Sequence, residues 1–511
     1  MADPARRVLL IGLDAGDPEL IERWTADGTL PHLAALRRAG VSGRLASSAQ
    51  HLAGSPWPTF YTSQPPSRHG LYHDYQWRQE EMGFAAPTYE WLPVSPFWRH
   101  LPADVPVVAY DVPMSLGTEP FNGTEVSGWA THDKVAPSAT HPVELLSTIT
   151  QRFGEWHIGP EEYGPPTVGE LLQLRDDLAE GVRRSTDLAL WLLQRPWRLA
   201  IIAFGALHRG GHRLFDRSSI AGSVAEAEGD RFDRALRDLY VACDGALGRL
   251  VAAAPDAVII AFSTHGMVAN SCRVDLLDEM LARVLEGRSD ARPRYGPVRR
   301  LGEAVPIKWR RAAALRVPSA LRNRIMTAWS AGGIRWDRTR AFTLRADLQG
   351  YIRLNLAGRE PRGIVPAAES DSLCDRIADG LLSFRDAATR EPVVHAVERS
   401  DRLFPNGDRR DRLPDLVVRW NDSPAAAHTA VESAAFGRIP WQTPGRVPNG
   451  RSGNHRGEGF VIARGRGIPV GQRLAPGADV LDLAPTVVHL LGSRAEVPLA
   501  GKPIAGVGPS A

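Results

Sequence analysis

Short apolar runs alternate with longer amphipathic segments along this chain, and this alternation limits the possible fold more than any other feature. Runs typical of β-strands lie at Val8–Leu13, Val105–Tyr110, Leu199–Phe204, Val258–Phe262 and Leu416–Trp420. Helical patterns separate them at Pro18–Ala39, Val168–Gln194 and Ala225–Ala253. Strands that are apolar throughout belong to a sheet covered on both faces. The sequence therefore predicts an α/β fold with a largely parallel central sheet.

Length and composition agree with a folded protein that is not specialised for nucleic acid. The 511 residues, of which 43% are hydrophobic, suffice for one large domain with insertions or for two or three smaller domains. The net charge is only +3 and the basic residues are scattered, so no nucleic-acid partner is indicated. The nearest basic cluster is interleaved with apolar residues and favours a solvated helix face over an anion contact. It consists of Arg310, Arg311, Arg316, Arg322 and Arg324.

Cysteine usage and hydropathy indicate the compartment. Cys243, Cys272 and Cys374 are dispersed and lack a CxxC spacing, which argues against a disulfide framework and against a thiolate zinc site. The first apolar run closes at Asp14 and is too short for a signal peptide. No other stretch approaches the roughly 20 apolar residues that span a bilayer. We expect a cytoplasmic protein with no membrane partner, whose oligomeric state the sequence leaves open.

One segment interrupts the α/β pattern. Residues 276–340 have weaker periodicity and many Arg and Pro residues, which predicts an insertion or cap. The catalytic domain would then consist of residues 1–275 and 341–511.

Polar residues follow the predicted strands at the edge where such sheets bind ligands. Asp14 comes directly after the first strand and suits a divalent metal, and its alternative role is to cap the next helix, for which Asp17 is the better candidate. His208 and His212 follow the strand at 199–204. Their spacing of four residues lets both imidazoles bind one metal, in a helix or in a loop.

Two further histidines have comparable positions. His265, preceded by Thr264, follows the strand at 258–262, and His455 precedes another predicted strand at Phe460–Ala463. Each histidine alone is equally compatible with a structural role. Several such sites along one α/β chain predict ligands that only the fold brings together.

Together these segments resemble the type I phosphodiesterase and nucleotide pyrophosphatase branch of the alkaline phosphatase superfamily. The resemblance covers nearly the whole chain in the family's order. It is carried by Leu10–Asp14, Trp57–Gly70, the turn His265–Met267, Ile352–Pro361, Gly363–Val365, the His455 loop and Ala478–Thr486. It implies an alkaline-phosphatase-like, three-layer αβα sandwich that hydrolyses phosphate esters of a small organic substrate with a metal, as a phosphodiesterase or phosphomonoesterase. Fold alone would not establish this activity.

The resemblance also implies a metal set. One ion would be held by His208, His212 and His455. A second would be held by Asp14 and His265, together with the nucleophile oxygen and with Thr264 as a possible ligand. Zn²⁺ is expected, as one ion or two, with Mn²⁺ or Fe²⁺ as alternatives. Two such ions stabilise the attacking and leaving oxygens of an in-line displacement.

The ligand set departs from the family's pattern at two carboxylates, which are replaced by His208 and Thr264. The first site becomes a three-histidine site with an open position, whereas the second keeps Asp14 as its only carboxylate and binds metal weakly or not at all. Two alternatives stay open. One is hydrolysis of a sulfate, phosphonate or phosphoramidate, or redox chemistry at iron. The other is a non-catalytic binding protein.

The nucleophile is the third departure. The family's usual position falls on Ala53, which has no reactive group. Ser55 is the nearest hydroxyl that a helix N-terminus would favour, and it is the candidate catalytic residue, with Thr59 a weaker one. The alternative for Ser55 is an N-cap role with Pro56 at the first helical position. Without a side-chain nucleophile, a metal-bound hydroxide would attack instead.

Aromatic and polar residues near these segments are candidates for the substrate pocket. Trp57, Trp129 and His132 are predicted to contact substrate, and Asp133 lies beside them. His69 is expected to be structural.

Overall fold

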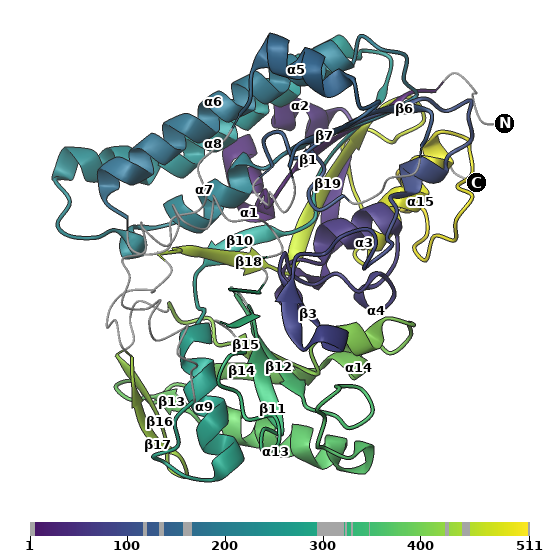
Figure 1. The fold of residues 1–511 in the computed structure, drawn as a ribbon. Helices are drawn as coiled ribbons and strands as arrows, with labels where there is room; N and C mark the ends of the chain where they lie inside the picture. The colour runs from purple at the N-terminus through teal and green to yellow at the C-terminus, as the bar shows by residue number, and fades with distance from the viewer. Residues whose placement is uncertain are drawn as a thin grey trace.

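A nine-stranded mixed sheet forms the centre of the computed structural model (Figure 1). The structure describes residues 6–115, 120–131, 137–156, 166–293, 321, 324–325, 327–328, 331–346, 348–424, 429–441 and 450–508. The strand order is β20-β2-β19-β9-β1-β8-β5-β6-β7. Their bounds are β1 (Val8–Leu13), β2 (Val41–Ala46), β5 (Val107–Tyr110), β6 (Gly123–Ser127), β7 (Ala139–His141), β8 (Leu199–Phe204), β9 (Val258–Ser263), β19 (Glu458–Arg464) and β20 (Gln472–Arg473). β19 and β7 run antiparallel to their neighbours, and the other pairs are parallel.

Helices cover both faces of this sheet, as Figure 1 shows. One face packs against α1 (Pro18–Ala26), α2 (Pro31–Arg38), α6 (Val168–Leu192), α7 (Ala206–Leu214) and α8 (Glu226–Ala253), and the other against α3 (Pro56–Thr62) and α15 (Leu483–Leu490). β1 explains why both faces need cover. Leu9 and Ile11 lie in the first core and Val8 and Leu10 in the second, because successive side chains of a strand point to opposite faces. The predicted three-layer αβα fold is confirmed.

The predicted helix Pro18–Ala39 is in fact two helices, α1 and α2. Asp17 caps α1, since its carboxylate accepts the backbone N–H groups of Glu19 and Leu20 at 3.0 Å each. The chain turns between the two helices at Gly28, whose φ of +84° favours glycine, and α2 starts with Pro31. The apolar periodicity continued across this turn and therefore concealed it.

A second group of strands has its own core. β11 (Ala341–Leu344), β12 (Gly350–Leu354), β15 (Leu416–Trp420) and β14 (Val394–Arg399) form an antiparallel sheet in that order. α9 (Val274–Glu286) and α13 (Ser370–Leu382) pack on it, and β13 (Arg385–Asp386), β16 (Ala430–Ser433) and β17 (Gly437–Pro440) form a small sheet beside it. The strand predicted at 416–420 is present, but in this antiparallel sheet. Its composition could not tell one buried sheet from another.

The boundaries of this second unit bear on the domain prediction. Its apolar core extends from Cys272 to Trp441. We therefore propose that the inserted unit comprises residues 272–441, instead of ending at residue 340. Most of the segment 294–330, including four arginines of the predicted basic cluster, lies outside the described residues, and Arg324 is exposed.

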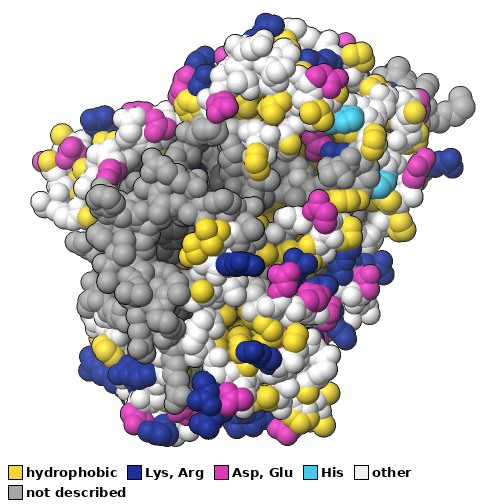
Figure 2. Space-filling view, viewed as in Figure 1, with side chains coloured by type: hydrophobic (Ala, Val, Ile, Leu, Met, Phe, Trp, Pro, Cys, Tyr) yellow, Lys and Arg dark blue, Asp and Glu magenta, His cyan; other side chains and the backbone are white. Residues whose placement is uncertain are grey.

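The surface and the cysteines fit the composition. On the face drawn in Figure 2, acidic and basic side chains intermingle over the described surface. The three cysteines are buried. Within the described residues, no helix is both long enough and apolar enough to cross a bilayer.

Candidate metal centre

Three neighbouring parallel strands bring most of the predicted ligands to one edge of the sheet. β9, β1 and β8 lie side by side, so the residues that follow them meet at their carboxyl ends. Asp14 follows β1, and its backbone N–H donates to Phe204 at the end of β8 (3.0 Å). The helix α7, which carries His208 and His212, follows β8, and His265 follows β9. The predicted convergence of these segments is therefore present.

His455 reaches the same place through a separate pair of strands. β10 (Gly266–Ala269) pairs with β18 (Gly453–Arg456), and Met267 lies opposite His455. β18 also approaches α7 closely, because a Cβ atom at Gly453 would lie 2.0 Å from the carbonyl oxygen of Gly211. Only glycine fits at this position, so Gly453 allows the strand to bring His455 against the histidines of α7.

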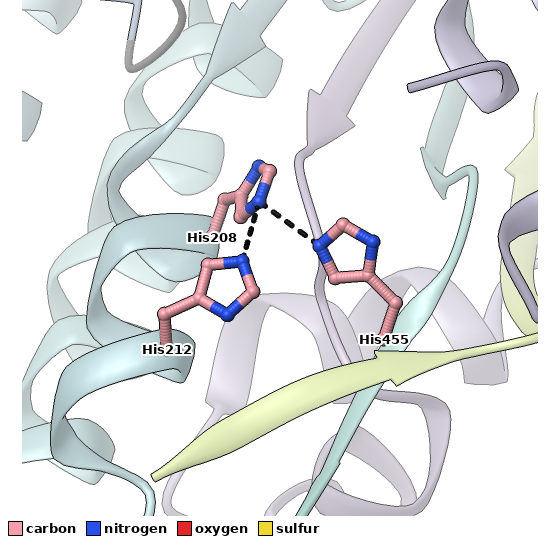
Figure 3. Close-up of side chains that lie close together, drawn as sticks. All are labelled: His208, His212 and His455. Atoms are coloured by element: carbon pink, nitrogen blue, oxygen red, sulfur yellow. Dashed lines mark hydrogen bonds between the residues drawn. The ribbon is translucent and has the colours of Figure 1, made fainter. Parts of the chain in front are cut away.

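The three histidines His208, His212 and His455 point their Nε2 atoms at a common point (Figure 3). The Nε2 atom of His208 lies 2.9 Å from that of His212 and 3.0 Å from that of His455. Zn–N bonds of about 2.0–2.1 Å in a tetrahedral site place nitrogens roughly 3.3 Å apart, so a slight opening of this triangle would admit the ion. All three side chains are buried.

Hydrogen bonds on the far side of two rings select the tautomer that binds metal. The Nδ1–H of His212 donates to the carbonyl oxygen of Gly453 (2.9 Å), and the Nδ1–H of His208 donates to Oδ2 of Asp14 (3.0 Å). Since carbonyl and carboxylate oxygens only accept, both Nε2 atoms carry lone pairs. Lone pairs that face each other across 2.9 Å repel unless a cation or a proton lies between them. This donor set therefore fits a divalent metal.

Burial favours the neutral state of His455. The pKa of His455 lies well below its usual value because the ring is buried, and because His265, His208, His212 and Arg451 disfavour a further positive charge. Neutral imidazole is the form that binds metal, so protons compete little with an ion here.

Asp14 has a neighbour whose role the sequence did not reveal. The indole N–H of Trp57 donates to Oδ1 of Asp14 at 2.7 Å, and the carboxylate is fully buried. The Trp57 ring packs edge-on against Phe60 and Phe262 and is 4% exposed. Trp57 was predicted to contact substrate, but its donor group is used by the carboxylate.

Thr264 and His265 lie beside the histidine triangle. The Thr264 hydroxyl is 3.1 Å from Nδ1 of His265, and the ring centroids of His265 and His455 are 4.2 Å apart. Asp14, His208 and His265 form a second group whose ligand atoms lie within 4.8 Å of one another. Five of the six residues predicted as metal ligands therefore lie in these two groups, which share His208, and the sixth, Thr264, contacts His265.

Ser55 is the N-cap residue of α3 with Pro56 at the first helical position, as its structural alternative predicted. Its hydroxyl makes no capping hydrogen bond. It donates backwards to the carbonyl oxygen of Leu52 (2.7 Å) and lies 2.6 Å from the hydroxyl of Ser48. Within the described residues, none of its hydrogen-bond partners belongs to the metal-ligand groups.

Trp129 and His69 are accounted for by packing and hydrogen bonds within the protein. Trp129 belongs to the first core, is 3% exposed and donates its indole N–H to the carbonyl oxygen of Gly154 (3.3 Å), so a substrate contact is not supported. His69 is structural: Nδ1 accepts the N–H of Leu71 at 3.0 Å, which leaves the proton on Nε2 for Thr59 at 3.1 Å. Burial and the charge of Arg409 lower its pKa to about 3. His132 and Asp133 lie outside the described residues.

Comparisons with known proteins identify the family of this chain and agree with its fold. The sequence matches the type I phosphodiesterase / nucleotide pyrophosphatase family over residues 8–433, and the chain therefore belongs to this family of phosphate-ester hydrolases. Phosphonoacetate hydrolase from Sinorhizobium meliloti 1021, solved with phosphonoacetate, is 13% identical, with 96% of each chain covered and a TM-score of 0.50. An inactive variant of murine ectonucleotide pyrophosphatase / phosphodiesterase 5, solved with AMP, is 11% identical over 97% of each chain, with a TM-score of 0.48. No curated protein sequence matches.

Proposed function

We propose that this protein is a metal-dependent hydrolase of phosphate-type esters of a small organic molecule, acting at the centre formed by His208, His212 and His455. The observation that carries the proposal is the convergence of three Nε2 atoms, together with the partners Asp14 and Gly453 that set the tautomers of His208 and His212. A divalent ion there would polarise a phosphoryl oxygen as a Lewis acid. The chain's own groups hold the ion, orient its ligands and keep water away from their outer sides.

Activity with and without metal tests this proposal. The protein should contain at least one transition-metal ion and hydrolyse nitrophenyl phosphate or bis(nitrophenyl) phosphate. A chelator should abolish turnover while the circular dichroism spectrum stays unchanged, and Zn²⁺, Mn²⁺ or Fe²⁺ should restore it. Folded, metal-loaded protein that is inert towards these esters contradicts the proposal.

A second substrate class is supported by the two missing carboxylates at positions 208 and 264. With fewer negative ligands, the charge of a bound ion is less neutralised. The ion then attracts an anionic substrate more strongly. Phosphonoacetate and nitrophenyl sulfate therefore belong in the same assay. Faster turnover of either compound than of the phosphate esters would favour this alternative.

Replacement of Ser55 with alanine tests whether its hydroxyl is the nucleophile. Because that hydroxyl is bonded to Leu52 and Ser48, we expect Ser55→Ala to retain activity within about threefold and to destabilise the fold by about 1 kcal/mol. Steady-state kinetics and urea unfolding measure the two effects. Loss of turnover together with loss of a pre-steady-state burst would instead identify Ser55 as the nucleophile.

A further inference from the structure

We infer that this centre holds one metal ion, at His208, His212 and His455, and that Asp14 orients His208 instead of binding a second ion. The inference rests on the proposed metal centre and states its composition. It concerns Asp14 because that residue is the only carboxylate in either ligand group.

Both nitrogens of the His208 ring have a partner. An imidazole has two nitrogens, and here Nε2 belongs to the histidine triangle while Nδ1 lies 3.0 Å from Oδ2 of Asp14. A carboxylate that accepts the outer N–H of a ligating histidine fixes the ring and raises its basicity. Asp14 occupies this position, and Gly453 occupies the equivalent position behind His212.

The other oxygen of Asp14 also accepts a hydrogen bond. Oδ1 accepts the indole N–H of Trp57 at 2.7 Å, so an N–H dipole points at each carboxylate oxygen. A cation beside this carboxylate would face the positive ends of both dipoles. Trp57 cannot turn away easily, because its ring packs against Phe60 and Phe262 and lies against Gly12, where a Cβ atom would be 2.7 Å from the ring.

The second ligand group offers few atoms that could bind an ion. Ala53, at the family's nucleophile position, offers no oxygen, and the Thr264 hydroxyl is 3.1 Å from Nδ1 of His265. A second ion would therefore depend on Asp14, His265 and the Nδ1 atom of His208, which would have to lose its proton. Asp14, which the resemblance to the family assigns to a second ion, is in this chain a hydrogen-bond partner of His208, a ligand of the first ion.

Metal counting tests the inference independently of hydrolysis. Metal-free protein is titrated with Zn²⁺, separated from free metal by gel filtration and analysed by mass spectrometry of the metal. We expect one ion per wild-type chain. Asp14→Asn and His265→Ala should each still bind one ion, with Asp14→Asn about 10–100-fold weaker in competition with a chromophoric chelator, because a ligand has lost its outer carboxylate. Trp57→Phe should weaken binding less, since it acts on the metal through Asp14.

Matched controls separate this effect from general destabilisation. Asp244→Asn removes another buried carboxylate that accepts two backbone N–H groups, and Trp98→Phe removes a buried indole that donates no hydrogen bond within the described residues. Both should bind Zn²⁺ like the wild type.

Two results would overturn the inference: two ions per wild-type chain that fall to one in Asp14→Asn or His265→Ala, or an unchanged affinity in both Asp14→Asn and Trp57→Phe. One bound ion without hydrolysis of any ester would refute the proposed function and leave this inference standing.

Discussion

Replacing His212 with alanine is expected to lower the affinity for Zn²⁺ by more than about 100-fold and to reduce ester hydrolysis by a similar or larger factor. Removal of an outer partner of a metal ligand costs about 10–100-fold, and removal of a ligand itself costs more. His212 is the ligand that another group can least easily replace. Its ring is 1% exposed and is fixed by the bond to Gly453, and water admitted by the alanine would supply only a neutral oxygen.

The control for this variant is His395→Ala, which removes an exposed histidine of β14 in the second unit. Its metal content and turnover should equal those of the wild type. Zinc titration and steady-state kinetics of both variants, with circular dichroism to establish folding, make the comparison. A folded His212→Ala protein that binds Zn²⁺ normally would place the metal elsewhere and remove the basis of the proposed function.

The sequence predicted those parts of the site that depend on strand ends. β1 and β8 have the predicted bounds, and a parallel sheet necessarily gathers the residues that follow such strands, so Asp14 and His208 could be assigned to one site. The contact of Asp14 with Trp57 could not be predicted in this way. Trp57 lies on α3, on the other side of the sheet from α7, and an indole N–H has no periodic signature.

Hydrogen bonds from side chains to backbone atoms could not be predicted from the sequence either. The tautomer of His212 depends on the carbonyl group of Gly453, which is 241 residues away and is positioned by the pairing of β10 with β18. One signal was present in the sequence, because Gly453 stands two residues before His455. A glycine at that point indicates that two backbone segments approach each other closely, but it does not indicate which segments.

The segment Ile352–Pro361 shows the opposite case, a family signature whose residues are structural. Arg353 is fully buried, and its Nε–H donates to Oε1 of Glu360 at 2.6 Å. The two remaining nitrogens of Arg353 donate to the carbonyl oxygen of Leu413 (2.9 Å) and to Gln79 (2.7 Å). Trp77 donates to the second oxygen of Glu360 at 3.1 Å. This network joins β12 of the second unit to β3 (Gln76–Arg78), which comes after α3 in the chain.

We expect Glu360→Gln to lower the free energy of unfolding by about 3–5 kcal/mol, because it removes the carboxylate that is paired directly with the buried charge of Arg353. Burial already lowers the pKa of Arg353, which indicates that the charged guanidinium is held there against a desolvation cost. Urea unfolding followed by tryptophan fluorescence measures the loss. Zinc stoichiometry of the folded variant should stay at the wild-type value, since no metal ligand is touched.

A matched substitution compares the stability contribution of this buried ion pair with that of an ion pair at the surface. Glu369 pairs with Arg340 at the surface, where both side chains are more than a third exposed, so Glu369→Gln should cost no more than about 1 kcal/mol. The double variant Arg353→Met with Glu360→Leu should recover much of the stability that Glu360→Gln loses, because neither charge then remains buried. Equal losses for the buried and the exposed glutamate would show that solvent reaches Arg353, and the signature segment would then need an explanation other than the joining of the two units.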